Sequence, residues 1–322
     1  MILLWRVTTW CNFACGFCAY DRRQAFERRS ADADEIERVV GLVAQVAAQR
    51  GERLLVSWIG GEPLGWSPLL KLSERLARRH SVALSMTTNG TRLQRSEVRA
   101  RILASFAELT LSIDGPGPLH DSLRGAKGSH ARIVEAIEAL VREREQSGVP
   151  LKLRANVVLM RATLPHFPDL CRMLADTGID EITFNQLGGR DRPEFFPAQR
   201  LLPRDAEQLA HIVPALQGEL AARGCRLCSA STYLDRIAAS SRGEALPVSD
   251  CRPGEQFLFV DENGLVAPCS FTTEDYGLPT ASLMTPEDIV SLAGQFGRRR
   301  IAATAESCRD CPSTQMFGKF AA

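Results

Sequence analysis

The segment Cys11-Asn-Phe-Ala-Cys15-Gly-Phe-Cys18, which follows an apolar run at 2–9, is the most informative stretch of this chain. Three thiolates at spacings of four and three residues can hold one [4Fe–4S] cluster from a single loop. Such clusters normally take four cysteines, so three leave one iron open to a ligand. A zinc site or a coincidental cysteine-rich loop is the alternative, but zinc sites favour four ligands in paired short spacings. The spacing therefore favours an iron–sulfur cluster.

Outward from this loop, short apolar runs alternate with amphipathic helical patterns over the first two-thirds of the chain. The expected strands are 2–9, 53–59, 82–88, 108–114, 151–159 and 181–187. The expected helices are 33–50, 66–80, 94–105, 129–148, 163–177 and 204–223. Six βα units in series predict parallel strands joined by right-handed crossovers.

The predicted strands end in polar and glycine-rich segments. These are Gly60–Pro63, Thr87–Gly90, Ser112–Pro116, Asn156 and Asn185–Gly189. Ligands of parallel α/β sheets bind at the carboxyl ends of the strands. The sequence therefore predicts a ligand site along one edge of the sheet.

The composition argues against nucleic-acid and membrane binding and indicates the cellular compartment of the protein. Among 322 residues, apolar types make up 45% and the formal net charge is +1, so no global field favours nucleic acid or an anionic membrane. No apolar run reaches the roughly 18 residues of a membrane span, and the first residues do not resemble a signal peptide. We therefore expect a cytoplasmic protein that binds neither nucleic acid nor membrane. In that reducing compartment, clustered cysteines indicate metal binding, whereas the isolated Cys171 is expected to be a buried helical residue.

The cysteine loop and the strand ends together resemble the radical S-adenosylmethionine (SAM) superfamily, whose signature is CxxxCxxC with an aromatic residue before the last cysteine. Phe17 fills that position, and the resemblance covers roughly residues 3–215. It implies a partial (β/α)6 TIM-like barrel in which Cys11, Cys15 and Cys18 hold a [4Fe–4S] cluster. In that family SAM chelates the open iron, and one electron from the cluster cleaves it to a 5′-deoxyadenosyl radical.

The resemblance also assigns SAM contacts. Gly60–Pro63 matches the family's GGEP motif, in which the glycines allow close approach to the ligand and the carboxylate of Glu62 accepts from the SAM ammonium. Thr87–Thr91 resembles the family's TNG segment, and Arg124 matches an arginine that pairs with the SAM carboxylate. The residues predicted to bind SAM are Phe17, Gly60, Gly61, Glu62, Pro63, Thr88, Asn89, Ser112, Asp114, Arg124 and Asn156.

Three residues are predicted to act on the substrate: Tyr20, Arg154 and Asn185. Arg154 shares the parity of Asn156 on the fifth strand, and a salt bridge at the bottom of the sheet is its alternative role. Other candidates for substrate recognition have ordinary solvated loop residues as their alternative. They are Asp21, Gln186, Arg190, Asp191, Arg192, Thr272, Thr273, Glu274 and Asp275.

Four distal cysteines predict a second centre. Cys251 is followed by twelve residues, Gly264, four more residues and Cys269, and Cys308-Arg-Asp-Cys311 comes later. This pattern resembles the start of a SPASM domain and especially its short relative, the twitch domain, which implies one auxiliary [4Fe–4S] cluster. Zinc is the alternative for four such thiolates. The pair Cys225 and Cys228 fits neither motif; these thiols are packed in a connector, join the auxiliary site or donate a hydrogen atom.

The expected domains are a radical SAM partial barrel at 1–223, a connector at 224–249 and a twitch (SPASM-like) domain at 250–322. The main hypothesis is a radical SAM oxidoreductase that uses the auxiliary cluster to oxidise a small polar metabolite resembling a sugar, cyclitol or nucleoside. Relatives of that kind include dehydrogenases of aminocyclitol and aminoglycoside biosynthesis. The alternatives are a maturase of a ribosomally made peptide and a non-catalytic, zinc-stabilised binding protein. A flavodoxin or ferredoxin is the expected electron donor.

Overall fold

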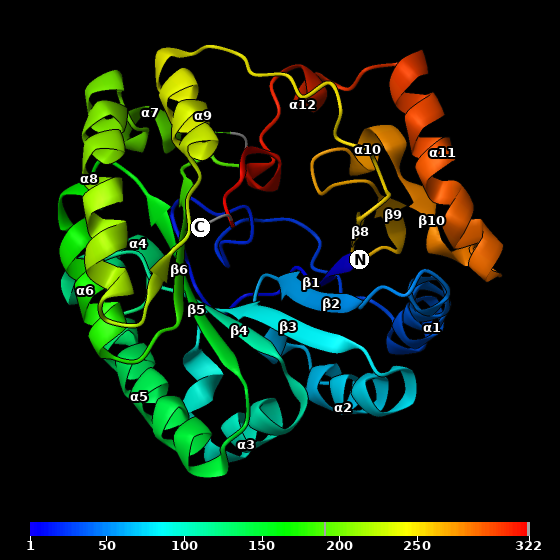
Figure 1. Cartoon of the computed structure of the whole chain (residues 1–322), viewed down its shortest axis with the longest axis horizontal. Helices are drawn as coiled ribbons and strands as arrows, with labels where there is room; N and C mark the ends of the chain where they lie inside the picture. The colour runs from blue at the N-terminus through cyan, green and yellow to red at the C-terminus, as the bar shows by residue number, and fades with distance from the viewer. Residues whose placement is uncertain (190, 321–322) are drawn as a thin grey trace.

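The computed structural model describes residues 1–189 and 191–320 and contains one ten-stranded sheet (Figure 1). The strand order is β10-β9-β8-β1-β2-β3-β4-β5-β6-β7. Neighbouring strands from β1 to β7 are parallel, and β8 is parallel to β1. The sheet curves without closing, which confirms the predicted partial barrel.

The strands are β1 Ile2–Thr8, β2 Leu55–Gly60, β3 Ala83–Thr88, β4 Glu108–Ser112, β5 Lys152–Leu159, β6 Glu181–Gln186, β7 Arg226–Leu227, β8 Phe257–Val260, β9 Leu265–Ala267 and β10 Leu278–Pro279. The α-helices are α1 Ala33–Gln49, α2 Leu69–His80, α3 Ser96–Ser105, α4 Gly117–Arg124, α5 Ser129–Ser147, α6 Phe167–Asp176, α7 Phe196–Gln199, α8 Pro203–Ala221, α9 Ser231–Arg242, α10 Thr273–Tyr276, α11 Pro286–Ala302 and α12 Glu306–Arg309. Short 3-10 helices are η1 Pro63–Gly65, η2 Thr91–Gln94, η3 Leu164–His166, η4 Thr280–Ser282 and η5 Thr314–Phe317.

Helices α1, α2, α3, α5 and α6 cover the outer face of the sheet, while the loop after β1 and the C-terminal segment lie on its inner side (Figure 1). Strand β5 shows how the sequence produces this division. Leu153, Ala155, Val157 and Leu159 are fully buried, whereas the alternate residues are half-buried. Because side chains alternate across a strand, the apolar set packs under the helices and the polar set faces inward.

A C-terminal hairpin extends the main sheet. β8 and β9 form an antiparallel pair that turns through Gly264, whose φ of 76° lies in the left-handed region. Arg6 of β1 forms ion pairs with Asp261 and Glu262 in this turn. The division into barrel, connector and C-terminal domain stays a prediction.

Two long helices in the C-terminal third were not predicted from the sequence. Helix α9 lies in the expected connector, and α11 packs against α1. Helix α11 carried a start signal: Thr285 and Asp288 form a capping box around Pro286 at the first helical position. In the described residues, no helix is long and apolar enough to cross a bilayer.

Candidate active site

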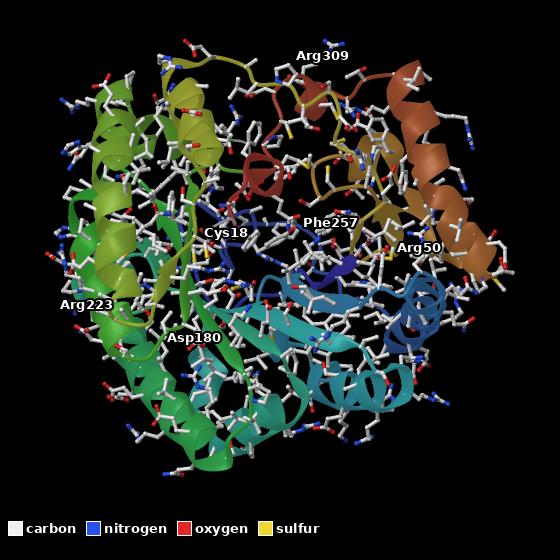
Figure 2. All side chains as sticks on the ribbon, in the orientation of Figure 1. Cys18, Arg50, Asp180, Arg223, Phe257 and Arg309 are labelled. Carbon is white, nitrogen blue, oxygen red and sulfur yellow. The ribbon has the colours of Figure 1, made fainter. Side chains whose placement is uncertain are left out.

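The three cysteines after β1 lie together in a loop on the inner side of the sheet. Cys18 lies near the middle of the view in Figure 2, whereas Arg50 and Arg223 lie at its edge. Burial raises the pKa of Cys11 and of Cys15 to about 11, and it raises that of Cys18. The negative charges of the three thiolates also act on one another, which places the sulfurs close together.

The loop supplies groups that favour thiolates over thiols. The backbone N–H of Phe13 donates to Sγ of Cys11, and that of Tyr20 donates to Sγ of Cys18, both at 3.4 Å. The cation of Arg124 lowers the pKa of each of the three thiols, against the larger effect of burial. Such donors and charges suit the deprotonated sulfurs that a cluster requires.

Glu62 is buried between the second and third strand ends. Its Oε1 accepts from Thr88 Oγ1 at 2.6 Å and from the backbone N–H of Leu64 at 3.0 Å, and its Oε2 accepts from the backbone N–H of Asn89 at 2.7 Å. Burial raises the pKa of this carboxyl, and these hydrogen bonds oppose that effect. Oε2 therefore keeps acceptor capacity for an ammonium.

Close backbone contacts within the protein require the glycines before Glu62. A Cβ atom on Gly60 would come within 2.4 Å of the carbonyl oxygen of Thr8, and one on Gly61 within 2.2 Å of that of Trp10. The backbone N–H of Glu62 donates to the same Trp10 oxygen at 2.7 Å. The motif thus lets the cysteine loop pack against β2, and its close approach to SAM stays a prediction.

Asn89 ties the third strand end to the cysteine loop. Its Nδ2 donates to Asn12 Oδ1 at 2.8 Å, while its Oδ1 accepts from Thr91.

Phe17 lies under the guanidinium of Arg124, which is 5.5 Å from the ring centroid. Pro63 begins η1, and Glu62 caps that turn. The predicted SAM contacts therefore converge on the cysteine loop.

Asp114 and Arg124 bind each other. Nε of Arg124 donates to Asp114 at 2.7 Å, and the other carboxylate oxygen accepts from the backbone N–H of Val158 at 2.8 Å. Both side chains are buried. Asp114 therefore positions Arg124 beside Cys15, while Ser112 lies next to Asn156 in the register of β4 and β5.

Asn156 and Asn185 meet around a residue that the sequence analysis missed, Lys319. Nζ of Lys319 donates to Oδ1 of Asn156 at 2.8 Å and to Oδ1 of Asn185 at 2.7 Å. Asn185 also donates to Asn156 at 3.3 Å. Lys319 lies 134 residues beyond Asn185, and no local sequence pattern predicts such a contact.

Arg154 forms salt bridges at the bottom of the sheet, which is the alternative role predicted for it. It pairs with Glu181 and with Glu108, the first residues of β6 and β4, so it lies towards the amino-terminal ends of these strands. Tyr20 lies 5.8 Å from the guanidinium of Arg6, and burial raises the pKa of its hydroxyl to about 12. The roles of both in catalysis stay predictions.

The loop candidates fall in different places. Asp21 is buried and pairs with Arg23 and Arg192, which fastens the cysteine loop to the segment after β6. Thr272 is buried and contacts Sγ of Cys269 at 3.3 Å. Arg190 lies outside the described residues. Substrate contact by Gln186, Asp191, Thr273, Glu274 and Asp275 stays a prediction.

The four distal cysteines also come together. Cys308 and Cys269 act electrostatically on Cys251, and Cys251, Cys269 and Cys308 all act on Cys311. Arg300 Nη1 donates to Sγ of Cys251 at 3.1 Å, and the hydroxyl of Tyr276 lies 3.9 Å from Sγ of Cys308. By contrast, Cys171, Cys225 and Cys228 are fully buried in the core.

Within residues 1–189 and 191–320, no three His, Cys, Asp or Glu side chains are grouped closely enough to hold one metal ion. For the distal cysteines, the choice between an auxiliary [4Fe–4S] cluster and zinc stays a prediction.

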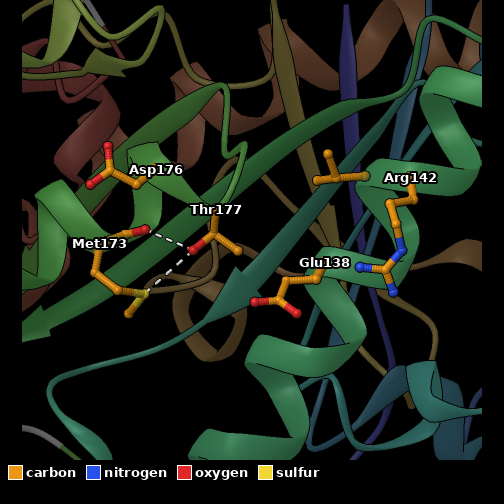
Figure 3. A pocket seen from close by; sticks show the side chains of 6 residues that line it. Glu138, Arg142, Met173, Asp176 and Thr177 are labelled. Atoms are coloured by element: carbon orange, nitrogen blue, oxygen red, sulfur yellow. Dashed lines mark hydrogen bonds between the residues drawn. The ribbon is translucent and has the colours of Figure 1, made fainter.

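A hollow on the outer surface lies apart from these groups (Figure 3). Its lining comes from α5 and from α6 with the residue that follows it, and includes Glu138, Arg142, Met173 and Asp176. The hydroxyl of Thr177 is used internally, donating to the Met173 carbonyl oxygen at 2.7 Å. The hollow therefore lies on the helical face of the sheet, opposite the inward-facing site.

Comparison with known proteins agrees with this geometry. The family model described as "Radical SAM superfamily" matches residues 5–149. Mycofactocin maturase MftC of Mycobacterium ulcerans is 26% identical over 321 residues, which cover 96% of this chain and 79% of that protein. Pre-heme d1 synthase of Dinoroseobacter shibae is 28% identical over 201 residues, which cover 60% of this chain and 46% of that protein.

The fold has solved counterparts. Streptococcus suis SuiB, in its complex with precursor peptide SuiA, superposes with a TM-score of 0.69 at 16% identity, and the match covers 100% of this chain and 71% of SuiB. The chain spans less than half of the synthase but more than two-thirds of the maturase and of SuiB. Residues 5–149 therefore match the radical SAM superfamily, and the relatives named here are consistent with its SPASM/twitch subgroup.

Proposed function

We propose that this enzyme is a maturase of a ribosomally made peptide, which is the alternative of the sequence analysis. The match to a protein named as a maturase over 96% of this chain carries the proposal. The shared fold of SuiB, solved with a precursor peptide, supports it. The sugar, cyclitol or nucleoside substrate of the main hypothesis therefore has less support.

In this proposal, Cys11, Cys15 and Cys18 hold the SAM-binding [4Fe–4S] cluster. When bound, the cluster and SAM supply a carbon radical that abstracts hydrogen. Oε2 of Glu62 has acceptor capacity for the SAM ammonium, and Asp114 fixes the cation of Arg124 beside the thiolates. The buried setting of these groups excludes water, which protects radical chemistry.

The proposal includes an auxiliary [4Fe–4S] cluster held by Cys251, Cys269, Cys308 and Cys311. Four protein thiolates leave no open iron, so this centre suits electron transfer. The net reaction is then an oxidation of the peptide, with a flavodoxin or ferredoxin as the reductant of the first cluster. Clustered free thiols also suit the reducing cytoplasm.

The test is to incubate the anaerobically reconstituted enzyme, SAM and a reductant with a short peptide encoded beside its gene. We expect 5′-deoxyadenosine and a mass change in the peptide that requires SAM. A panel of cyclitols, sugars and nucleosides is the matched comparison. Turnover of one of those compounds with no change in the peptide would replace the proposed substrate class by that of the main hypothesis.

A further inference from the structure

Lys319 places an amino group on the inner face of the barrel. It follows η5, which packs against α9: the backbone N–H of Ala230 donates to the Gly318 carbonyl oxygen at 3.1 Å, and Thr232 Oγ1 donates to that of Phe317 at 2.8 Å. Only 6% of Lys319 is exposed. The segment is thus docked so that its lysine points between β5 and β6.

The positive charge of this ammonium is not balanced by the described residues. Its hydrogen-bond acceptors are the neutral amides of Asn156 and Asn185, and within residues 1–189 and 191–320 no carboxylate forms an ion pair with it. Glu108 and Glu181 are engaged by Arg154. A buried charge without a counterion is costly, so the site favours an anion.

The hydrogen bonds of Lys319 leave one N–H donor for such an anion. The two amide oxygens take two of the three N–H groups of the ammonium, and the third remains for another acceptor. A carboxylate there would gain a charge-assisted hydrogen bond and neutralise the buried charge. We propose that Lys319 binds a carboxylate inside the barrel, and that this carboxylate belongs to the peptide substrate.

The identity of the substrate in this inference rests on the proposed function, whereas the carboxylate site does not. A second source of the same chemistry is the carboxylate of SAM, because Asn156 is also a predicted SAM contact. Both sources need the protonated amine.

The groups facing Lys319 predict how carboxylate binding by its amine depends on pH. They are Arg154 of β5, Cys228 after β7 and the ring of Phe320, whose centroid is 5.2 Å from Nζ. Burial, together with the charge of Arg154 and against the opposing effect of Cys228, lowers the pKa of Lys319 to about 7. A bound carboxylate favours the charged amine, so binding should weaken as the pH rises through that value.

The chain has four lysines, so the signal of each one can be followed separately by NMR. The holoenzyme labelled with [13Cε]lysine gives four signals, and Lys319→Met identifies the one from Lys319. Titration with sodium acetate should raise the midpoint of that signal's pH titration by about one pH unit, a tenfold preference for the charged form. Lys152, which already pairs with Glu108, is the internal control and should not respond.

Separate arms identify the source of the carboxylate. A shift with SAM alone assigns it to SAM; a shift that needs acetate or the peptide, but not the peptide amidated at its carboxylates, assigns it to the substrate. The variant Lys319→Arg, which keeps the positive charge, should retain the signals of the other three lysines and so shows that the fold tolerates substitution. No response of Lys319 to acetate, SAM or peptide, or equal responses of Lys319 and Lys152, would overturn the inference. A response to acetate without any peptide turnover would leave the site intact and refute only the proposed function.

Discussion

Asp114 and Arg124 form a buried ion pair whose loss should be costly. The substitution Asp114→Asn keeps the size of the side chain but leaves the cation of Arg124 without its partner. Breaking a buried pair on one side costs about 3 kcal/mol of unfolding free energy. Chemical denaturation of the apoprotein measures this loss.

The matched control is Asp169→Asn. Asp169 pairs with Arg172 on the surface, where the carboxylate side chain is 85% exposed. Exposed pairs contribute about 0–1 kcal/mol, so this variant should remain close to the parent. Equal effects of the two substitutions would show that Asp114 is not the anchor of Arg124.

His120 should make the stability pH-dependent. Burial and the charge of Arg124 lower its pKa to about 4, and its Nδ1 accepts from the backbone N–H of Asp114. The native state binds fewer protons than the unfolded state between about pH 4 and 6.5. Stability contributed by the neutral ring should therefore fall by up to about 3 kcal/mol as the pH drops through that window.

The measurement compares unfolding free energies of the parent and His120→Gln from pH 4 to 7. Glutamine can accept the same hydrogen bond without titrating. The two curves should approach each other as the pH falls. Parallel curves over the window would contradict the assigned role of His120.

At the level of elements, the cap of α11 should hold the C-terminal third together. The side chain of Thr285 accepts from the backbone N–H of Asp288. The buried face of the helix consists of Ile289, Leu292 and Phe296. Thr285→Ala should cost about 1 kcal/mol and increase hydrogen exchange in the first turn. Thr304→Ala, at an exposed position after the helix, should change stability by less than about 0.5 kcal/mol. Similar exchange in both variants would show that the cap is dispensable.

The same elements show what the sequence could predict. The period-two pattern of β5 predicted which side chains face inward, because one register satisfies both faces of a buried strand. Thr285–Asp288 is a start signal for α11, but the weak periodicity beyond residue 224 does not predict the helix that follows it. The meeting of Lys319 with Asn156 could not be predicted, because it depends on how η5 docks on α9 across 163 residues.

At the level of the whole molecule, one sheet connects the two groups of cysteines. The first loop follows β1, and Cys251 and Cys269 flank the hairpin whose strand β8 pairs with β1. The ion pairs of Arg6 with Asp261 and Glu262 fix that junction. A fixed junction suits electron transfer between two centres without a conformational step.

This arrangement predicts that the two cysteine groups are lost separately. The parent, reconstituted anaerobically, should bind about eight irons. Replacing Cys11, Cys15 and Cys18 with alanine should remove about four irons and all formation of 5′-deoxyadenosine. Replacing Cys308 and Cys311 should also remove about four irons but leave some SAM cleavage, uncoupled from peptide oxidation.

Cys225→Ala with Cys228→Ala is the matched control, since both thiols are buried outside the two groups and burial raises the pKa of Cys225 to about 12. That variant should keep about eight irons. Iron analysis and quantification of 5′-deoxyadenosine then separate the alternatives. SAM cleavage that survives loss of the first three cysteines would refute their assignment. Complete loss of SAM cleavage in a folded variant with Cys308 and Cys311 replaced by alanine would have a different meaning. The second centre would then position the substrate or support the fold instead of accepting an electron.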